Sequence, residues 1–255
     1  MKIGFPNHPG KNITDEIAWI GKNNFDFVDL FLEENMAVPE KINVNEVKKL
    51  LNKYGLDVVG HTAWYWPIGS PVSALRDATV KESVKYMQTF GKVGVRLVTV
   101  HTFWPPSIFS VNDGIKWQVQ TLERIMKEAK KFNVEIMLEP ADHKYDSIEN
   151  VSAILEKLPD LHLHLDIGHA NLHGRNIIEF IETFYRKIKH IHLHDNDGTS
   201  DQHRALGNGN INWKKVIPAL KKYYDGTITL EIFESNKRLV LESKEKLREL
   251  WIKSK

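Results

Sequence analysis

The 255-residue sequence contains no cysteine. Disulfide bonds, thiolate metal sites and cysteine nucleophiles are therefore excluded, and any metal ion has to be held by His, Asp or Glu side chains. The sequence also lacks a charge excess of either sign, because 35 basic and 33 acidic side chains leave a net charge of only +2. The strongly basic composition that is typical of nucleic-acid-binding proteins is thus missing, although a single basic face would suffice for DNA binding.

Long hydrophobic runs are absent as well. No apolar stretch approaches the roughly 20 residues that a helix needs to cross a bilayer, so we expect no membrane partner. The first residues, Met1–Phe5, indicate a strand and not a signal peptide, since no long apolar segment follows them. Together these absences predict a cytoplasmic protein.

Short β-type runs alternate with amphipathic helical stretches eight times along the chain. Continuous apolar runs such as Leu97–Val100 are typical of parallel strands that are covered on both faces. The predicted strands are Lys2–Phe5, Phe27–Leu32, Leu56–His61, Val95–His101, Val134–Glu139, Leu161–Asp166, His190–His194 and Ile228–Phe233. The predicted helices are Thr14–Lys22, Val44–Tyr54, Ala74–Lys92, Gly114–Phe132, Ser147–Lys157, Ile177–Tyr185, Trp213–Tyr223 and Lys237–Lys253. Eight such units, in a chain near the usual length of about 250 residues, predict a single-domain (β/α)8 TIM barrel that comprises residues 1–255.

Six successive predicted strands end in or near a side chain that can bind a metal ion. Each one alone has an ordinary explanation: a histidine there usually makes a local hydrogen bond, and Glu139 beside Pro140 could form an ion pair within a loop. Six in succession are hard to attribute to chance, because a buried carboxylate needs a compensating charge and a divalent cation supplies it. The sequence therefore predicts a metal site at the barrel mouth, where the strand ends converge. Its donors are His61, His101, Glu139, Asp166, His192 and Glu231.

Three further donors extend this set. His169 follows the predicted sixth strand, while Asp201 and His203 stand in a glycine-rich loop where turn formation alone would explain them. Beside the other candidates they indicate a second or third metal pocket. The mixture of carboxylates and imidazoles favours Zn²⁺, Mn²⁺, Co²⁺ or Fe²⁺ over Ca²⁺, and no organic cofactor is expected. Four other histidines are expected to face helices or loops and not a metal: His162, His164, His190 and His194.

Three motifs carry a resemblance to a known family. They are HLDIGHANL at His164–Leu172, HIHLHDNDG at His190–Gly198 with Asp201-Gln202-His203 shortly after, and LEIFE at Leu230–Glu234. With these motifs the chain resembles, from Met1 to about Trp251, the xylose isomerase-like barrels, which include endonuclease IV and the ketose 3-epimerases.

The two branches of that family imply different ion counts, from one to three. The endonuclease IV pattern implies three zinc ions, held by His61, His101 and Glu139, by Glu139, Asp166, His192 and Glu231, and by His169, Asp201 and His203. The epimerase pattern implies one Mn²⁺ or Co²⁺, held by Glu139, Asp166, His192 and Glu231. In the epimerase pattern the two glutamates also act as acid and base.

The chain departs from both branches. Endonuclease IV has a basic loop after its second strand that penetrates DNA, whereas this chain has the acidic segment Leu32–Asn35, which would repel a phosphate backbone. The chain is also somewhat short for endonuclease IV, and it has only eight arginines. The epimerases have an arginine shortly after the histidine of the seventh strand, and this chain lacks it. The loop with Asp201 and His203 occupies that neighbourhood instead.

Aromatic residues cluster after the third and fourth predicted strands. Indole rings stack on the C–H faces of sugars and also on unpaired bases, whereas packing of a lid over the barrel explains them equally well. With a neighbouring histidine they make up the predicted substrate contacts, which are His61, Trp64, Trp66 and Trp104.

Two functions compete on these grounds. The first is a divalent-metal-dependent isomerase or epimerase of a sugar or sugar phosphate, in which Glu139 and Glu231 transfer a proton beside a carbonyl and His169 orients a hydroxyl. The alternative is a zinc-dependent endonuclease acting at abasic sites, with DNA as its partner. The identity of the sugar and the oligomeric state stay open at this stage. The acidic loop and the near-neutral charge favour the enzyme acting on a small carbohydrate.

Overall fold

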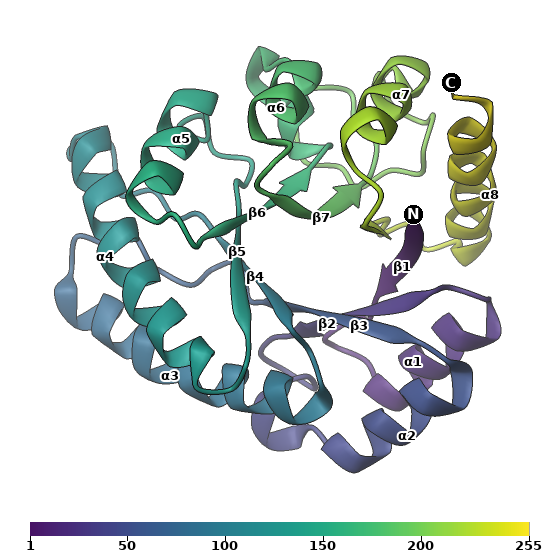
Figure 1. Cartoon of the computed structure of the whole chain (residues 1–255), viewed down its shortest axis with the longest axis horizontal. Coiled ribbons are helices and arrows are strands. Elements are labelled where there is room, and N and C mark those ends of the chain that lie inside the picture. The colour runs from purple at the N-terminus through teal and green to yellow at the C-terminus, as the bar shows by residue number, and fades with distance from the viewer. Residues whose placement is uncertain (255) are drawn as a thin grey trace.

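The computed structural model describes residues 1–254, which form eight parallel strands closed into a barrel. The strands are β1 (Lys2–Pro6), β2 (Phe27–Leu32), β3 (Asp57–Thr62), β4 (Leu97–His101), β5 (Glu135–Glu139), β6 (His162–Asp166), β7 (Ile188–Leu193) and β8 (Thr227–Leu230). Hydrogen-bonded neighbours follow the chain order, from β1 beside β2 round to β8 beside β1 (Figure 1). The (β/α)8 TIM barrel predicted from the sequence is therefore confirmed.

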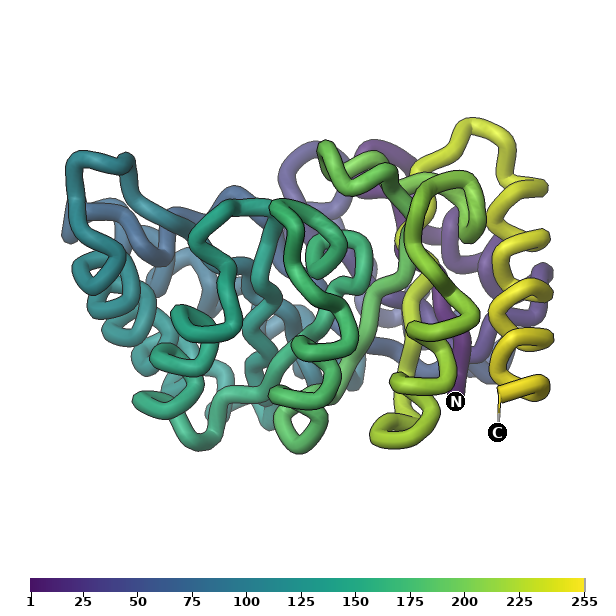
Figure 2. Tube along the Cα trace, turned by 90° about the horizontal axis from the view of Figure 1, so that it is seen from above, coloured from purple at the N-terminus to yellow at the C-terminus, as the bar shows by residue number. Residues whose placement is uncertain are grey.

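Helices follow the strands and surround the barrel (Figure 1). They are α1 (Ile13–Lys22), α2 (Val44–Tyr54), α3 (Ser73–Val93), α4 (Val111–Lys130), α5 (Ile148–Lys157), α6 (Ile177–Phe184), α7 (Trp213–Tyr223) and α8 (Lys237–Lys253), with the short 3-10 helices η1 (Pro39–Lys41) and η2 (His169–Gly174). Within residues 1–254, none of the helices is both long and apolar enough to cross a membrane. In Figure 2 both termini lie at the lower edge, so the carboxyl ends of the strands and the loops that follow them lie at the upper edge.

Local capping contacts determine where some of the helices begin and end. Ser110 and Asp113 form a capping box, so α4 starts at Val111, three residues before the predicted start at Gly114. At the other end of a helix, Gly55 adopts the left-handed conformation and stops α2. The start of α4 therefore depends on a local hydrogen-bond pattern that hydrophobic periodicity does not predict.

The eighth strand is shorter than predicted. Its pairing with β7 ends where Leu230 lies opposite Leu193, whereas the sequence predicts a strand that continues to Phe233. The backbone N–H of Glu231 still donates to the carbonyl of Leu193, at 3.1 Å. Glu231 therefore stands directly beyond the strand end, at the mouth of the barrel.

The barrel interior changes from apolar to polar along its axis. Phe27, Val59 and Met137 form a small buried cluster of their own. Two residues further along the same three strands, the inward positions are taken by Asp29, His61 and Glu139, since side chains on one face of a strand recur with period two. The outward positions pack against the helices in the main core. The interior thus combines an apolar layer with a polar layer toward the carboxyl ends.

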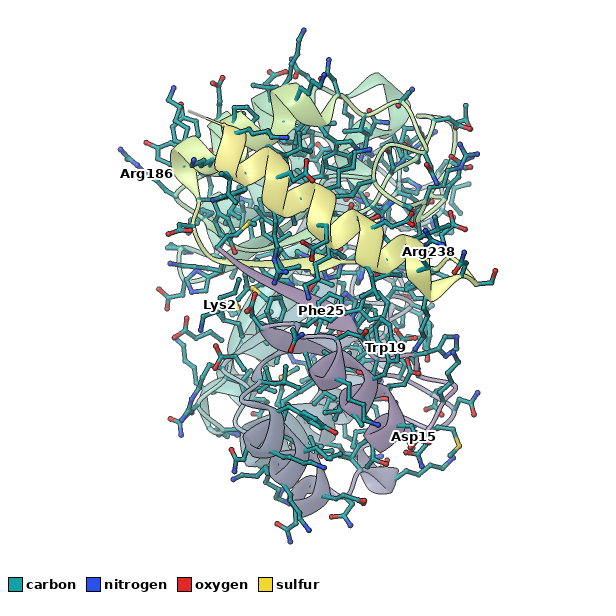
Figure 3. The ribbon with its side chains drawn as sticks, turned by 90° about the vertical axis from the view of Figure 1, so that its right-hand side faces the viewer. Lys2, Asp15, Trp19, Phe25, Arg186 and Arg238 are labelled. Atoms are coloured by element: carbon teal, nitrogen blue, oxygen red, sulfur yellow. The ribbon has the colours of Figure 1, made fainter. Side chains whose placement is uncertain are left out.

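The first and last helices lie beside each other on the outside of the barrel. Figure 3 shows α8 crossing beside α1, with Trp19 and Phe25 on this side of the molecule. The ammonium of Lys237 lies 4.1 Å from the centroid of the Trp19 ring, and that of Lys244 lies 4.5 Å from that of Phe25. Lys244 also donates to two backbone carbonyls that follow α1, each at 2.7 Å. Cation–π contacts and hydrogen bonds therefore join the two ends of the chain.

Candidate metal centre

The nine predicted donors come together at the mouth of the barrel. Each of them has a nitrogen-to-oxygen contact of 3.8 Å or less with another member of the set. Six stand at or next to the ends of strands, one stands in η2, and two stand in the loop between β7 and α7. In chain order they are His61, His101, Glu139, Asp166, His169, His192, Asp201, His203 and Glu231.

Glu139 lies at the centre of the first group of donors. Its carboxylate is fully buried, and Oε2 lies 3.0 Å from His61 Nε2, 3.1 Å from His101 Nε2 and 3.2 Å from His164 Nδ1. Three imidazoles therefore share one carboxylate oxygen. The other oxygen, Oε1, has no hydrogen-bond partner among the described residues. A buried carboxylate oxygen without a partner is costly, so this atom calls for a cation or a proton.

A second unpartnered oxygen faces the same place. Asp166 Oδ2 is buried and has no hydrogen-bond partner within residues 1–254, while Oδ1 of the same carboxylate accepts from the backbone N–H of His169 at 2.9 Å. His192 Nδ1 lies 3.8 Å from Asp166 Oδ2, 3.7 Å from Glu139 Oε1 and 3.1 Å from Glu231 Oε2. Three carboxylate oxygens thus surround one imidazole nitrogen. This donor set fits a divalent ion such as Zn²⁺, Mn²⁺ or Co²⁺.

Protons and cations compete for these atoms. Burial alone would lower the pKa of His192, but Glu231 and Glu139 raise it well above the ordinary value. Burial likewise opposes the ionised form of Glu139, but the histidines around it, His101 first, hold the pKa of this carboxyl well below its usual range. The cluster therefore combines ionised carboxylates with a protonated imidazole when no metal is bound. A divalent ion would displace that proton, because metal ligands bind in their deprotonated form.

Asp29 also belongs to the site, although the sequence did not predict it. Its carboxylate is fully buried in β2, and Oδ2 accepts from His192 Nε2 at 2.7 Å and from the Thr229 hydroxyl at 2.9 Å. His190 Nε2 lies 3.2 Å from the same oxygen. Asp29 thereby fixes the Nε2 proton of His192 and leaves Nδ1 directed toward the carboxylates. This arrangement of carboxylate, histidine and donor cluster is the usual outer support of a metal ligand.

Three of the four histidines that were expected to point away from the site lie inside the barrel. His164, His190 and His194 are fully buried, and His164 and His194 lie within 3.2 Å of Glu139 and Asp166 respectively. The expectation was wrong because residues two apart on a strand share a face, so His190 lies on the same side as His192. His162, at the start of β6, instead pairs with Glu135 outside the site, at 2.8 Å. The register shift between residues 163 and 164 separates His162 from His164.

A cavity of about 700 Å³ lies over the cluster, within the range usual for small-molecule sites. Its wall includes His61, His101, His169, Asp201, His203 and Glu231 together with apolar side chains from β1, β2 and the segment after β8. Glu33, from the acidic segment after β2, also lines it, and burial raises the pKa of this carboxyl. The acidic segment after β2 therefore contributes one carboxyl group to the cavity wall.

Only one of the three predicted tryptophan contacts lies at the cavity. Trp64 lines it and is 64% exposed. Trp66 is 7% exposed and packs edge-on against Tyr86, with ring centroids 5.0 Å apart. Trp104 is 8% exposed and donates from Nε1 to Asp146 Oδ1 at 2.7 Å. The packing of the loops thus accounts for Trp66 and Trp104, and Trp64 remains the candidate substrate contact.

The partner of Trp104 leads to a prediction on stability. Asp146 is fully buried, its Oδ2 has no hydrogen-bond partner in the described chain, and burial raises the pKa of its carboxyl to about 6. Since the folded protein then binds this proton more tightly than the unfolded chain, the ionised carboxylate costs stability above pH 6, and the cost fades as the pH falls toward 4. The full cost is on the order of 3 kcal/mol. We expect Asp146→Asn, which keeps the acceptor for Trp104, to raise the free energy of unfolding by about 1–2 kcal/mol at pH 8.

Urea unfolding of both proteins between pH 4 and pH 8, in the presence of a chelator, measures this difference. The donor cluster titrates in both proteins, so the difference between them isolates Asp146. A difference that does not change between pH 4 and pH 8 would show that Asp146 does not carry the cost.

Comparison with known proteins agrees with this architecture. A family model described as a xylose isomerase-like TIM barrel matches residues 17–254. The protein MJ1311 of Methanocaldococcus jannaschii is 29% identical over 94% of this chain and 85% of its own length. The structure of a D-tagatose 3-epimerase-like protein has a TM-score of 0.87 at 28% identity and covers 98% of this chain and 97% of its own. The IOLI protein, solved with a bound zinc atom, has a TM-score of 0.82 at 18% identity, over 100% and 99% of the two chains, which is a likeness of fold alone.

Proposed function

Because the chain belongs to the xylose isomerase-like TIM barrel family, we propose that it is a divalent-metal-dependent isomerase or epimerase of a sugar or sugar phosphate. The observation that carries the proposal is the cluster of His192 Nδ1 with oxygens of Glu139, Asp166 and Glu231 beside a cavity of small-molecule size. The D-tagatose 3-epimerase-like protein supports the substrate class, since its likeness extends along the whole barrel. The zinc atom of the IOLI protein supports a metal in a barrel of this fold.

The four clustered side chains would hold the ion, which supplies a Lewis acid to polarise a substrate carbonyl and a neighbouring hydroxyl. Glu231 is the proposed base that removes the proton beside the carbonyl, because its carboxylate lines the cavity. Glu139 is the proposed partner that returns a proton, since its carboxylate belongs to the same donor cluster as that of Glu231. Trp64 offers an exposed ring on which the sugar can stack.

The predicted role of His169 in orienting a hydroxyl stays a prediction, and the proposed mechanism does not depend on it. It lines the cavity, but its Nδ1 lies 3.1 Å from the carbonyl oxygen of Pro140 and its Nε2 lies 3.4 Å from Asp201 Oδ2. Both ring nitrogens are engaged, so neither is free for a substrate. The predicted substrate contact of His61 likewise stays a prediction, since its two nitrogens face Thr62 and Glu139.

Solvent deuterium exchange tests the proposal. With Mn²⁺, Co²⁺ or Zn²⁺ bound, and with a panel of ketoses and ketose phosphates in D₂O, we expect deuterium to appear at the carbon next to the carbonyl of the true substrate. The reason is that a proton removed by a carboxylate exchanges with solvent before one is returned. Proton NMR of the recovered sugar measures the exchange, and the metal-free protein is the control. Turnover of a ketose by the loaded protein with no deuterium at that carbon would contradict the proposed proton transfer.

The complete set of nine donors favours one second candidate, an endonuclease that cleaves DNA at abasic sites with closely spaced metals. Glu33 and Asp142 in the cavity wall would repel phosphates. Lys11 and Lys237 line the same wall, so it lacks the excess of positive charge that DNA binding favours. Nicking of an abasic-site duplex by the metal-loaded protein, without deuterium exchange into any sugar, would establish this candidate instead. Binding to about 6–10 phosphates would also weaken roughly 10³–10⁵-fold between 50 and 200 mM salt, whereas sugar binding would hardly change.

A further inference from the structure

Glu33 is a carboxylate of the cavity wall that the proposed mechanism does not use. It follows β2 directly, is partly buried, and lines the cavity together with Trp64 from the next loop. Its side chain accepts no hydrogen bond and forms no ion pair within residues 1–254. Burial raises the pKa of this carboxyl, and the charges of His61 and Glu231, which line the same cavity, act on it as well. A carboxyl group that is held partly out of water without a partner is available to a ligand.

Backbone contacts fix the segment that carries Glu33. Its N–H donates to the carbonyl of Ala37 at 3.2 Å, which closes a turn directly after β2. The next residue, Glu34, donates from its backbone N–H to the hydroxyl of Tyr65 at 3.3 Å. Tyr65 in turn packs edge-on against Trp64, with ring centroids 5.6 Å apart. The loops after β2 and β3 are therefore joined, and they hold the Glu33 carboxyl and the Trp64 ring in place before a ligand binds.

A carboxylate and an exposed indole ring together suit a sugar. The ring of Trp64 can stack on the C–H face of the sugar, and the carboxylate oxygens of Glu33 accept hydrogen bonds from its hydroxyl groups. Such bonds are strong because the acceptor is charged. A phosphate monoester carries nearly two negative charges at pH 7, so the same carboxylate would repel it.

The basic side chains of the cavity wall do not offset this repulsion. Lys237 is already paired with Glu16 at 3.3 Å, and its ammonium lies over the ring of Trp19. Lys11 is exposed. Apart from histidines and the ion pairs of Glu16, Asp201 and Glu231, the charged side chains of the wall are three acidic ones and one basic one, namely Glu33, Asp142, Glu234 and Lys11.

We propose that Glu33 determines the specificity of the sugar enzyme: its carboxylate accepts hydrogen bonds from hydroxyls of the bound sugar and disfavours a sugar phosphate. This role rests on the proposed function, and it narrows the substrate from a sugar or sugar phosphate to an unphosphorylated sugar. The metal and Glu231 act at the carbonyl, whereas Glu33 contacts a different part of the same molecule.

Binding of a hexitol tests this role separately from turnover. A hexitol has the hydroxyls of a ketohexose but no carbonyl, so it does not react, and calorimetry with the Mn²⁺-loaded protein measures its Kd directly. We expect Glu33→Gln to weaken hexitol binding about 10-fold, the usual size of a lost hydrogen bond to a charged group. The unchanged protein should prefer the hexitol to its terminal phosphate ester by about 10-fold or more. Glu33→Gln should reduce that preference, and Glu33→Lys should reverse it.

Glu34→Gln is the matched control, because it makes the same charge change one residue further along, at an exposed position outside the cavity wall. It should bind both ligands as the unchanged protein does. The Glu33 side chain has no partner within residues 1–254, so both Glu33 variants should fold, and circular dichroism checks this.

Three results would overturn the proposal: unchanged hexitol binding in folded Glu33→Gln, an unchanged preference between the two ligands in both Glu33 variants, or no hexitol binding by the unchanged protein. Failure of the proposed function has a different signature. In that case no sugar takes up deuterium, although the hexitol still binds and still depends on Glu33.

Discussion

Replacing Glu231 with Gln should lower kcat on the sugar substrate by about 10²–10⁴-fold, the usual contribution of a general acid or base. The amide cannot accept the proton beside the carbonyl. It also removes one ligand charge 3.1 Å from His192 Nδ1, so affinity for the ion should fall in the same variant. Turnover measured at saturating metal, with ion content determined on the same sample, separates the two losses. Glu139→Gln should have a loss of similar size, because Glu139 is the proposed partner in proton return.

Glu242→Gln is the matched control for these variants. Glu242 is half exposed on α8 and pairs with Arg238, and exposed pairs of this kind contribute little. Its turnover should equal that of the unchanged protein. If metal-saturated Glu231→Gln retained near-normal turnover on the true substrate, Glu231 would be a ligand at most, and the base would have to be sought elsewhere in the cavity wall.

The sequence predicts the barrel well because its signals are local and repeated. Apolar runs such as Leu97–Val100 give the strands, and their alternation with amphipathic helices gives the order of elements. The boundaries are less predictable where a single contact decides them. The Ser110 box sets the start of α4, and the last pairing of Leu230 ends β8. Such contacts depend on which neighbours the fold supplies.

The polar interior was predicted only in part, and the errors over the histidines have one cause. His192 was predicted to lie at the mouth, whereas His190 and His194, two residues away on either side, were predicted to face helices or loops. The alternation of a strand requires His190 and His192 to face the same way, and the structure has both within 3.2 Å of Asp29. Strict use of that period would have placed His164 with Asp166 as well.

Asp29 was missed for a different reason. It stands in the middle of Phe27–Leu32, three residues before the strand end, whereas the predicted metal ligands all stand at, near or after strand ends. A lone carboxylate in an otherwise apolar and fully buried strand is the signal that could have found it, since such a charge needs a partner. That partner, the pair His190 and His192, lies more than 160 residues away in the chain. No local pattern identifies it.

Asp29→Asn should weaken binding of the catalytic ion by about 10–100-fold, the usual cost of losing the carboxylate behind a metal-ligating histidine. The amide has nearly the shape of the carboxylate, so the barrel should fold. The amide lacks the negative charge that holds a proton on His192 Nε2, however. Its NH₂ group can instead donate a hydrogen bond to that nitrogen. The Nδ1 atom of His192 is then less firmly directed toward Glu139, Asp166 and Glu231. Competition of the metal-free protein with a chromophoric chelator measures the affinity.

A control and a spectroscopic readout separate this role from general destabilisation. Asp57→Asn, at the start of β3, removes an exposed carboxylate that pairs with Lys2 and should leave metal affinity unchanged. Nitrogen NMR of the metal-free protein should show His192 protonated at both ring nitrogens in the unchanged chain and a lower occupancy of the Nε2 proton in Asp29→Asn. Unchanged affinity together with an unchanged His192 signal, in a folded variant, would show that the surrounding barrel alone orients His192. The structure favours the carboxylate, because Asp29 Oδ2 lies 2.7 Å from Nε2 with no exposure to solvent that would weaken the contact.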